Sequence, residues 1–360
     1  MAEPLRVFVT ADPELPVPPP LYGGIERVVA LLVEGLVERG HEVTLFAHAD
    51  SKASADLVAY SGLRSGSAAD TMINAAQIAF EAAKRHPHVI HSFGRLAYLL
   101  PVLPLPVPKV MSYQRAITPR SVDMGTRLSR GTLHFAACSR HLIKDVGGPN
   151  WQVIYNGVPI DRYQFEAAVS SDAPLMFLGR VERIKGPHLA IEIARKAKQR
   201  LIIAGNVPEG PEHQAYFKAE IEPHIDGRAI MYAGPVDDAM KSELLSQVQA
   251  LLMPVLWNEP FGIVMAEAFA CGTPVIGFAR GAVPEVVADG VTGFVGRNVD
   301  ELVAAIGRLS RIDRRACREV AERRFSQKAV VDGYEALYRR IARPSPAAVD
   351  AHQPELEREG

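Results

Sequence analysis

Short apolar runs rich in β-branched residues alternate with amphipathic stretches of helical spacing along most of this chain, and the alternation occurs twice. This pattern is typical of a parallel sheet flanked by helices. The first series predicts strands at residues 5–9, 41–46, 89–93, 109–113 and 133–138, with a first helix at about 25–38. The second series predicts strands at residues 175–178, 201–204, 230–232, 251–255 and 275–278. We therefore expect an α/β fold in which two Rossmann-like parallel-sheet domains face a central cleft.

The length of the chain fits this division, because 360 residues suffice for two domains of roughly 150 to 200 residues each. We predict an N-terminal domain at residues 1–155 and a C-terminal domain at residues 156–324. Residues 343–360 contain three prolines, many charges and no aromatic side chain, so we predict a disordered tail there.

Charge and cysteine content exclude several classes of partner. Forty Lys and Arg oppose 41 Asp and Glu, a net charge of −1, so no overall field recruits nucleic acid or anionic lipid. Cys138, Cys271 and Cys317 form neither a disulfide framework nor a zinc pattern, and they suit a reducing compartment, with the cytoplasm as the default. We expect no secretory signal and no transmembrane segment, because prolines interrupt the uncharged, leucine-rich stretch at 96–108.

Standard cofactor motifs are missing from the sequence. Neither Gly-x-Gly nor Gly-Lys-Ser/Thr occurs, which argues against a dinucleotide fingerprint and an ATP phosphate loop. His86, His88 and His91 are close in sequence but straddle a helix end and a strand start, so a metal there is disfavoured. Asp237 and Asp238 open a helical run, where capping is the expected role. We therefore expect no metal and no bound cofactor.

The most informative segment is residues 258–276, NEPFGIVMAEAFACGTPVI. Pro260 and Gly272 predict the start and the end of one short helix aimed from the cleft. Free N–H groups at its start and the positive end of its dipole suit an anion such as a diphosphate. The amides concerned are those around Phe261, Gly262, Ile263 and Val264.

Two carboxylates accompany this helix start. Glu259 stands just before the helix and Glu267 about two turns later, and side chains lean toward a helix N-terminus, so both can face one ligand. Two such acceptors fit a polyol. A solvated helix position is the alternative for Glu267, but its apolar neighbours favour a buried acid with a functional partner.

Two loops supply further candidates. Arg180 and Lys185 follow the first strand of the second domain, where ligands bind in such sheets, and the pair suits two phosphates of one diphosphate. Basic loop residues alone are usually surface charges, but an anion-seeking helix in the same domain favours binding. Gly23 and Gly24 follow the first strand of the first domain and permit a tight turn with amides exposed toward the cleft.

These three segments together resemble the retaining glycosyltransferases of family 4, which have the GT-B fold of two facing Rossmann-like domains. The resemblance covers nearly the whole chain, and the Glu-x7-Glu pair with Glu-Pro-Phe-Gly is its most specific part. The segments that extend it are Gly23-Gly24-x-Glu26, Asn156-Gly157-Val158, Gly179-Arg180, Lys185-Gly186, 281–285 and 290–294.

The resemblance implies a role for each part of the second domain. Arg180 and Lys185 would hold the donor diphosphate, and Glu267 would hold the ribose hydroxyls. Glu259 and the amides of residues 261–264 would hold the transferred sugar and the phosphate.

From the first domain, Gly23 and Gly24 would approach the donor, and Asn156 would stand beside it at the domain junction. The resemblance also implies that the last helix, at residues 325–342, crosses back and completes the first domain.

One departure concerns the donor sugar. Many relatives carry a histidine after the strand that resembles residues 109–112, and here Gln114, followed by Arg115, stands nearest to that position. Either His91 substitutes for it or His91 is an ordinary histidine at a strand end. Residues 13–22 and 114–130 are expected to touch the acceptor; their arginines are read as solvated charge, with an anionic acceptor or a membrane surface as the alternative.

The resemblance implies a glycosyltransferase that moves a sugar from a nucleotide-diphosphate sugar, UDP favoured, with retention and without a metal. A non-hydrolysing sugar-nucleotide epimerase is one alternative, although its acid and base residues cannot be placed. A non-catalytic sugar-nucleotide-binding protein is the other, and mere nucleotide binding would not require Glu259.

Overall fold

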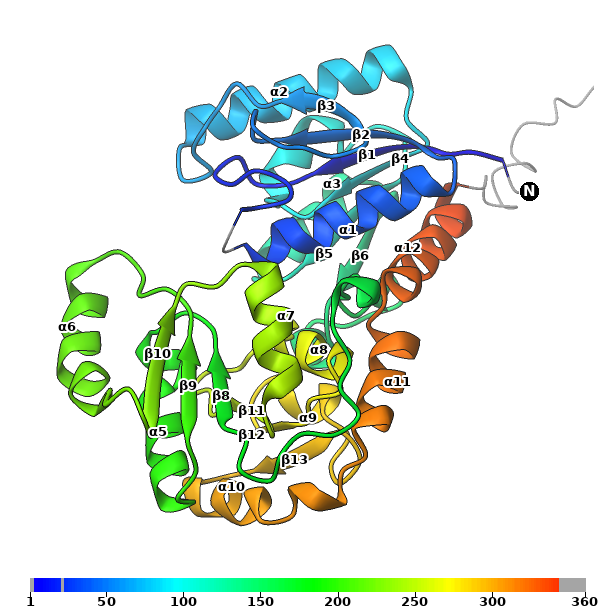
Figure 1. Ribbon diagram of the computed structural model, residues 1–360. Coiled ribbons are helices and arrows are strands. Elements are labelled where there is room, and N and C mark those ends of the chain that lie inside the picture. Colours follow the sequence, from blue (N-terminus) through cyan, green and yellow to red (C-terminus); the bar gives the residue numbers. More distant parts are fainter. Residues whose placement is uncertain (1–2, 21–22, 343–360) are drawn as a thin grey trace, which may run out of the picture.

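The computed structural model describes residues 3–20 and 23–342, which form two parallel-sheet domains, the first above the second in Figure 1. The first sheet has the strand order β3-β2-β1-β4-β5-β6-β7 and the second β10-β9-β8-β11-β12-β13, and all pairings are parallel. The strands of the first sheet are β1 (Arg6–Thr10), β2 (Glu42–Ala47), β3 (Asp56–Ala59), β4 (Val89–Ser92), β5 (Lys109–Tyr113), β6 (Leu133–Ala137) and β7 (Trp151–Val153). Those of the second are β8 (Leu175–Leu178), β9 (Leu201–Ala204), β10 (Ile230–Gly234), β11 (Leu251–Met253), β12 (Val275–Phe278) and β13 (Gly293–Gly296). The predicted fold of two Rossmann-like domains is confirmed.

Helices and 3-10 turns connect these strands. Those of the first half are α1 (Gly24–Glu38), α2 (Ala68–Arg85), η1 (Leu96–Val102), α3 (Pro119–Leu128) and α4 (Arg140–Ile143). Those up to β12 are η2 (Ile160–Arg162), η3 (Arg183–Lys185), α5 (Pro187–Lys196), α6 (Pro211–Glu220), η4 (Glu222–His224), α7 (Asp238–Gln247) and α8 (Ile263–Ala270). The last are α9 (Val283–Val286), α10 (Val299–Ile306), η5 (Leu309–Arg311), α11 (Arg314–Arg324) and α12 (Gln327–Ala342).

All ten predicted strands are present, and the three that the sequence pattern missed are short strands at sheet edges. β3 and β7 are the outer strands of the first sheet, and their side chains are half-buried or exposed. β13 is the outer strand of the second sheet and begins and ends with glycine. An apolar run therefore does not mark these strands, because β3 and β7 are only partly covered and β13 is interrupted by its two glycines.

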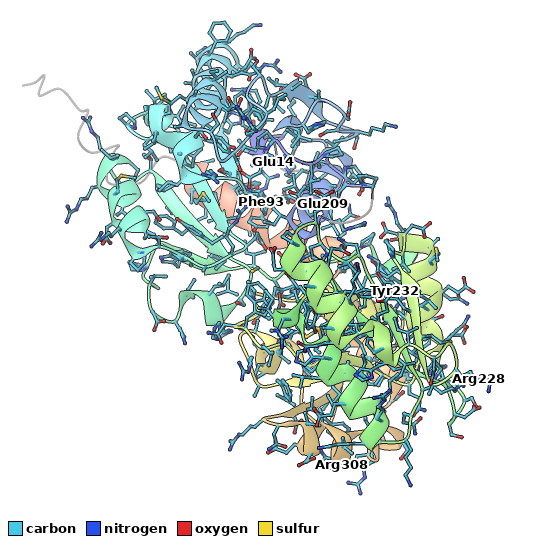
Figure 2. The ribbon with its side chains drawn as sticks, turned by 90° about the vertical axis from the view of Figure 1, so that its left-hand side faces the viewer. Glu14, Phe93, Glu209, Arg228, Tyr232 and Arg308 are labelled. Carbon is cyan, nitrogen blue, oxygen red and sulfur yellow. The ribbon has the colours of Figure 1, made fainter. Side chains whose placement is uncertain are left out.

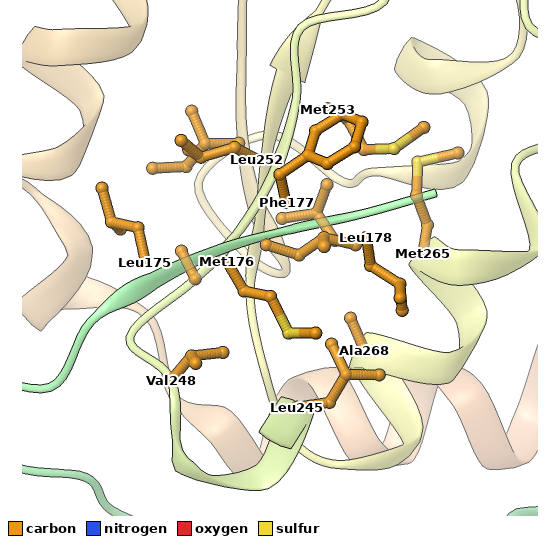
Figure 3. Packing of buried hydrophobic residues seen from close by; sticks show 14 of the residues in the cluster. Leu175, Met176, Phe177, Leu178, Leu245, Val248, Leu252, Met253, Met265 and Ala268 are labelled. Atoms are coloured by element: carbon orange, nitrogen blue, oxygen red, sulfur yellow. The ribbon is translucent and has the colours of Figure 1, made fainter. Parts of the chain in front are cut away.

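Each face of the first sheet has its own layer of helices. Apolar side chains of α1 and α12 pack on one face, and those of α2, η1 and α3 pack on the other. In the second domain one large cluster joins the sheet to its helices, and Figure 3 shows Phe177 and Leu178 of β8 packed near Met253 of β11 and Met265 of α8. This packing fixes the end of β8 against the start of α8, where the candidate site lies.

The last helix returns to the first domain. After α11 the chain turns upward in Figure 1, and α12 runs beside α1. Tyr334, Leu337 and Tyr338 of α12 are 1% exposed or less within the core of the first sheet. The last helix of the described chain thus completes the packing of the N-terminal sheet. The predicted disordered tail, residues 343–360, lies outside the described residues.

Candidate active site

Two adjoining pockets lie where the domains meet, at the carboxyl edge of the second sheet. They have volumes of about 240 and 270 Å³ and share much of their lining, so together they reach the range of roughly 300 to 1,000 Å³ typical of ligand sites. Figure 2 shows Glu14, on the loop after β1, and Glu209, on the loop after β9, on the sides of the domains that face each other. The residues common to both pockets are Gly24, Leu178, Gly179, Arg180, Ile263 and Val264.

The strand order places this cleft. β8 is flanked by β9 on one side and by β11 on the other, so chain connections leave in opposite directions at its carboxyl end. Such a switch point leaves a crevice in which open α/β sheets bind ligands. Arg180 follows β8 directly and lines both pockets, while Lys185 lines the pocket nearer β11. Both residues of this predicted pair thus line pockets at the carboxyl edge of the second sheet.

The short helix of this segment starts later than the sequence predicts. α8 begins at Ile263, and Gly262 is its N-cap residue with φ of 76° and ψ of 71°. Pro260 therefore does not start the helix but lies in the loop before it. A side chain at residue 262 would place its Cβ 2.8 Å from Met265 Cε, so glycine is needed here for backbone angle and for space.

The start of α8 faces the cleft. Its N-cap residue, Gly262, has no side chain to accept a hydrogen bond from the first N–H groups of the helix. Phe261, Gly262, Ile263 and Val264 all line the first pocket. The first N–H groups of a helix have no partners within the helix, and together with the helix dipole they attract an anion. The later start leaves the predicted amides at the mouth of the helix.

Glu259 and Lys185 form an ion pair within the first pocket. Lys185 Nζ lies 2.7 Å from Glu259 Oε2, and the indole Nε1 of Trp257 donates to the same oxygen at 3.0 Å. The Lys185 ammonium also lies 4.7 Å from the centre of the Trp257 ring. Glu259 is 6% exposed, so its carboxylate is buried but satisfied. Both contacts fall on one oxygen, which orients the carboxylate at the pocket wall.

Glu267 lines the second pocket and has partners that the sequence did not reveal. Lys241 Nζ lies 2.5 Å from Glu267 Oε1, and the Tyr163 hydroxyl donates to the same oxygen at 3.0 Å. Burial, reinforced by the Glu267 carboxylate, raises the pKa of Tyr163, so this hydroxyl stays protonated. Lys241 sits in a helix of ordinary polar composition, and no signal in the sequence marks it as a partner.

A chain of charges links this second pocket to the first domain. Lys241 also lies 3.0 Å from Asp238 Oδ1, and Arg27 of α1 lies 2.5 Å from Asp238 Oδ2. Asp237 beside it caps α7 by accepting a hydrogen bond from Met240 N, so the predicted capping role is confirmed.

Arg180 also has a partner that the sequence did not reveal. Glu182, which is 5% exposed, lies 2.7 Å from Arg180.

The first domain brings glycines and amides to the cleft. Gly24, Gln114 and Asn156 line the first pocket, and Gly23 lines the second. Asn156 Nδ2 donates to Gln114 Oε1 at 2.8 Å, which joins the two residues across the domain junction. Gly23 is the N-cap residue of α1 with φ of 148°, and a Cβ there would lie 2.7 Å from Pro19, so this position requires glycine.

His91 does not reach the cleft, which corrects its candidacy for the sugar. It is 0% exposed, and its two ring nitrogens lie 2.6 Å from Tyr338 Oη and from Ser112 Oγ. Arg115, considered for the sugar or the acceptor side, is paired with Asp12 at 2.7 Å and lines a different pocket, in the first domain. Of the three residues considered for the sugar side, only Gln114 lines the donor cleft. A strand that is buried on both faces explains why His91 is a core residue.

This buried histidine predicts a pH effect on stability. Burial lowers the pKa of His91 to about 3, whereas an unfolded histidine titrates near 6.5. Between these values the unfolded state binds more protons, so stability falls as pH drops below about 6.5. We expect His91→Gln to be less stable than the wild type at pH 8 but to lose about 2 kcal/mol less on going to pH 5. Urea unfolding at both pH values measures this, and equal losses would contradict it.

The described part of the chain has neither a cluster of metal-ligating side chains nor a membrane-spanning helix. Within residues 3–20 and 23–342, no group of three or more His, Cys, Asp and Glu side chains could hold a metal ion. His88 Nδ1 accepts a hydrogen bond from the backbone N–H of Arg6, and His86 ends α2. No helix in the same part of the chain has the length and apolar character to cross a membrane.

Comparison with known families divides the chain near the point where it leaves the first sheet. A profile described as Glycosyltransferase Family 4 matches residues 22–162, and one described as Glycosyl transferases group 1 matches residues 161–324. The chain belongs to the family 4-type glycosyltransferases. AviGT4, a glycosyltransferase involved in avilamycin A biosynthesis, has a TM-score of 0.72 and 25% identity over 94% of this chain and 98% of its own. This glycosyltransferase-family chain therefore has the GT-B fold.

The names of other similar proteins mention different molecules. D-inositol 3-phosphate glycosyltransferase from Mycobacterium marinum is 31% identical to this family 4-type chain over 200 residues, 51% of this chain and 42% of that protein. The match thus spans less than half of the mycobacterial relative. The structure of HepE from Anabaena in complex with UDP and glucose has a TM-score of 0.74 to this chain at 17% identity. The alignment covers 93% of this chain and 100% of HepE, and it shows a similarity of fold.

Proposed function

We propose that this chain is a retaining glycosyltransferase that moves a sugar, of hexosyl type, from a nucleotide-diphosphate sugar to an acceptor hydroxyl without a metal ion. UDP is the nucleotide we favour. The observation that carries the proposal is the meeting of two cations, a helix start and two buried carboxylates in one cleft. The reducing cytoplasm is the proposed location, which suits three free and buried cysteines.

A diphosphate fits the cation side of the cleft. Arg180 offers a planar fork, Lys185 a mobile ammonium, and the amides at the start of α8 offer neutral donors. As the bond to the leaving group breaks, negative charge grows on the diphosphate. Donors held in position stabilise that charge, and one such contact contributes ~3 kcal/mol to the transition state. The protein's own cations thus supply the stabilisation that a divalent ion would otherwise give.

The two carboxylates suit the two sugar rings of the donor. Glu259 is held through Oε2, which directs Oε1 toward hydroxyls of the transferred sugar. Glu267 is held through Oε1, which directs Oε2 toward the ribose. Lys185 and Lys241 pair with these two buried acids, and the second oxygen of each carboxylate can accept hydrogen bonds from a ligand. This division of roles is the proposed basis of donor recognition.

Retention follows if the acceptor attacks on the face from which the diphosphate leaves. The bond between the anomeric carbon and the phosphate oxygen breaks, and the bond to the acceptor oxygen forms on the same side. The acceptor's hydroxyl proton passes to the leaving phosphate oxygen. No covalent intermediate is assigned, because Glu259, the acid beside the proposed sugar position, is already committed to Lys185 and Trp257.

A donor assay tests the proposal. We expect UDP to raise the thermal midpoint more than GDP or ADP, and UDP-hexoses to be hydrolysed slowly with retention even without an acceptor. Excess EDTA should leave that turnover unchanged, because Arg180 and Lys185 stand in for a metal. Complete loss with EDTA, restored by Mg²⁺, would refute the metal-free account. Conversion of the donor to an epimer would favour the epimerase. Nucleotide binding without any turnover would favour the non-catalytic sugar-nucleotide-binding protein.

A further inference from the structure

Exposed apolar side chains are concentrated on one layer of the first domain. In the described part of the chain, eleven large apolar side chains are exposed, and eight of them lie between residues 63 and 128. They belong to α2, η1, α3 and their loops, the layer that covers one face of the first sheet. We call these eight residues the outer apolar face: Leu63, Met72, Ile73, Phe80, Leu100, Leu105, Met124 and Leu128. Exposed apolar side chains that lie on one layer mark a candidate interaction surface.

The same layer is strongly basic. Residues 61–130, all of which the structure describes, contain nine Lys and Arg against three Asp and Glu, a net charge of +6 in a chain whose total is −1. Asp123 is the one acidic residue of this range that is exposed. The exposed cations are Arg64, Lys84, Arg95, Arg115, Arg120, Arg127 and Arg130. The near-neutral total thus conceals a local excess, which sequence-wide counting did not reveal.

α3 combines both features within three turns. Val122 and Gly125 face the core, while Met124 and Leu128 are 45% and 47% exposed. Arg120 and Arg127 are exposed on the same helix, and Arg130 follows it. A short helix with exposed apolar side chains among arginines suits the boundary between lipid headgroups and acyl chains. Anionic headgroups attract the cations while the apolar side chains enter the boundary.

We propose that the outer apolar face docks on the surface of an anionic lipid bilayer. The positive charge distinguishes this occupant from a second copy of the chain, because two such faces would repel each other across a two-fold interface. Apolar side chains on η1 and α3 that flank arginines provide the two contributions that peripheral binding requires. Docking does not depend on the proposed sugar transfer, so either can fail alone.

This face adjoins an open pocket of the first domain. Leu100 of η1 and Met124 of α3 both line it, with Arg95 and Arg115, and its volume is about 480 Å³. Gln114 lines this pocket and also the first donor pocket, so the two are neighbours. A docked bilayer would thus lie beside the entrance to the cleft. If the proposed function holds, the acceptor is an amphiphilic alcohol presented from the membrane.

Vesicle sedimentation tests the docking. We expect the full chain to bind vesicles of equimolar phosphatidylglycerol and phosphatidylcholine, to bind pure phosphatidylcholine vesicles at least tenfold less, and to dissociate at high salt. Phe80→Ser with Leu128→Ser should reduce binding at least tenfold, as should Arg120→Gln with Arg127→Gln. UDP binding should be unchanged in both double variants, which shows that they are folded.

Matched substitutions on the second domain serve as controls. Val291 and Met240 are 49% and 45% exposed, so Val291→Ser with Met240→Ser removes two exposed apolar side chains from the second domain. Lys218→Gln with Arg228→Gln removes two exposed charges, and Figure 2 shows Arg228 far from the first domain. Both controls should bind vesicles like the wild type. The proposal would be overturned if the chain did not bind vesicles, or if both double variants bound them like the wild type. It would also be overturned if the chain formed a dimer that Leu128→Ser dissociates.

Discussion

Replacing Lys185 by alanine is expected to lower kcat by about 10²- to 10³-fold, the range measured when one pre-oriented donor to a developing anion is removed. Lys185 lines the first pocket and is 19% exposed in its side chain, so little water can replace it. The loss should exceed any change in the affinity for UDP, because the ammonium matters most when the leaving diphosphate gains charge. Single-turnover kinetics with saturating donor measure it.

The substitution also leaves Glu259 without its ion-pair partner, and removing one member of a buried pair destabilises a fold. Lys185→Arg keeps the charge and should fold normally while recovering only part of the activity, because a planar fork replaces a compact ammonium. Lys196→Ala, which removes an exposed lysine of α5, is the matched control and should leave kcat unchanged. Full activity in Lys185→Ala would remove the lysine from the diphosphate site.

Replacing Glu259 by glutamine is expected to lower kcat by about 100-fold while the dissociation constant for UDP changes less than twofold. The amide keeps the size of the side chain, but it loses the negative charge that faces the cationic anomeric centre. UDP itself lacks the transferred sugar, so its affinity should not report on Glu259. Calorimetry with UDP and turnover with a UDP-hexose separate the two effects.

Glu267→Gln is the control for this assignment, since it should show the opposite signature. Lys241 would lose its carboxylate partner and the ribose its charged acceptor, so UDP should bind about tenfold more weakly. The two variants thus distinguish the sugar side of the cleft from the nucleoside side. Turnover that is unaffected in Glu259→Gln would remove the main role assigned to Glu259.

The sequence predicted the parts of the fold whose signal is a continuous apolar run. Every side chain of strands such as β8 and β12 is buried, and the ends of these strands match the predicted ones. β3 and β7 escaped because edge strands are only partly covered, which leaves their residues mixed in character. The start of α8 was misplaced by three residues because Pro260 resembles a first helical residue, whereas the left-handed Gly262 sets the cap.

The candidate site was predictable where residue type and strand end coincide. Arg180, Lys185 and Glu259 lie together in one pocket because each stands just beyond a strand of the same sheet. Lys241 and Tyr163 could not be found in this way, because they come from a helix face and an inter-domain loop. The sequence left two readings of His91 open, a residue beside the sugar or an ordinary histidine at a strand end, because its pairing with Tyr338 depends on a helix 247 residues later.

The return of α12 to the first sheet imposes an order on synthesis. The α1 side of that sheet stays uncovered until Tyr334 and Tyr338 have left the ribosome, long after β7 has been made. At about 5 to 20 residues per second, the wait lasts roughly 10 to 35 seconds. During it, apolar residues of β1 and α1 lack their final cover, so chaperones that hold nascent chains should engage the first domain preferentially. A chain cut short before α12 would be released with that surface still open.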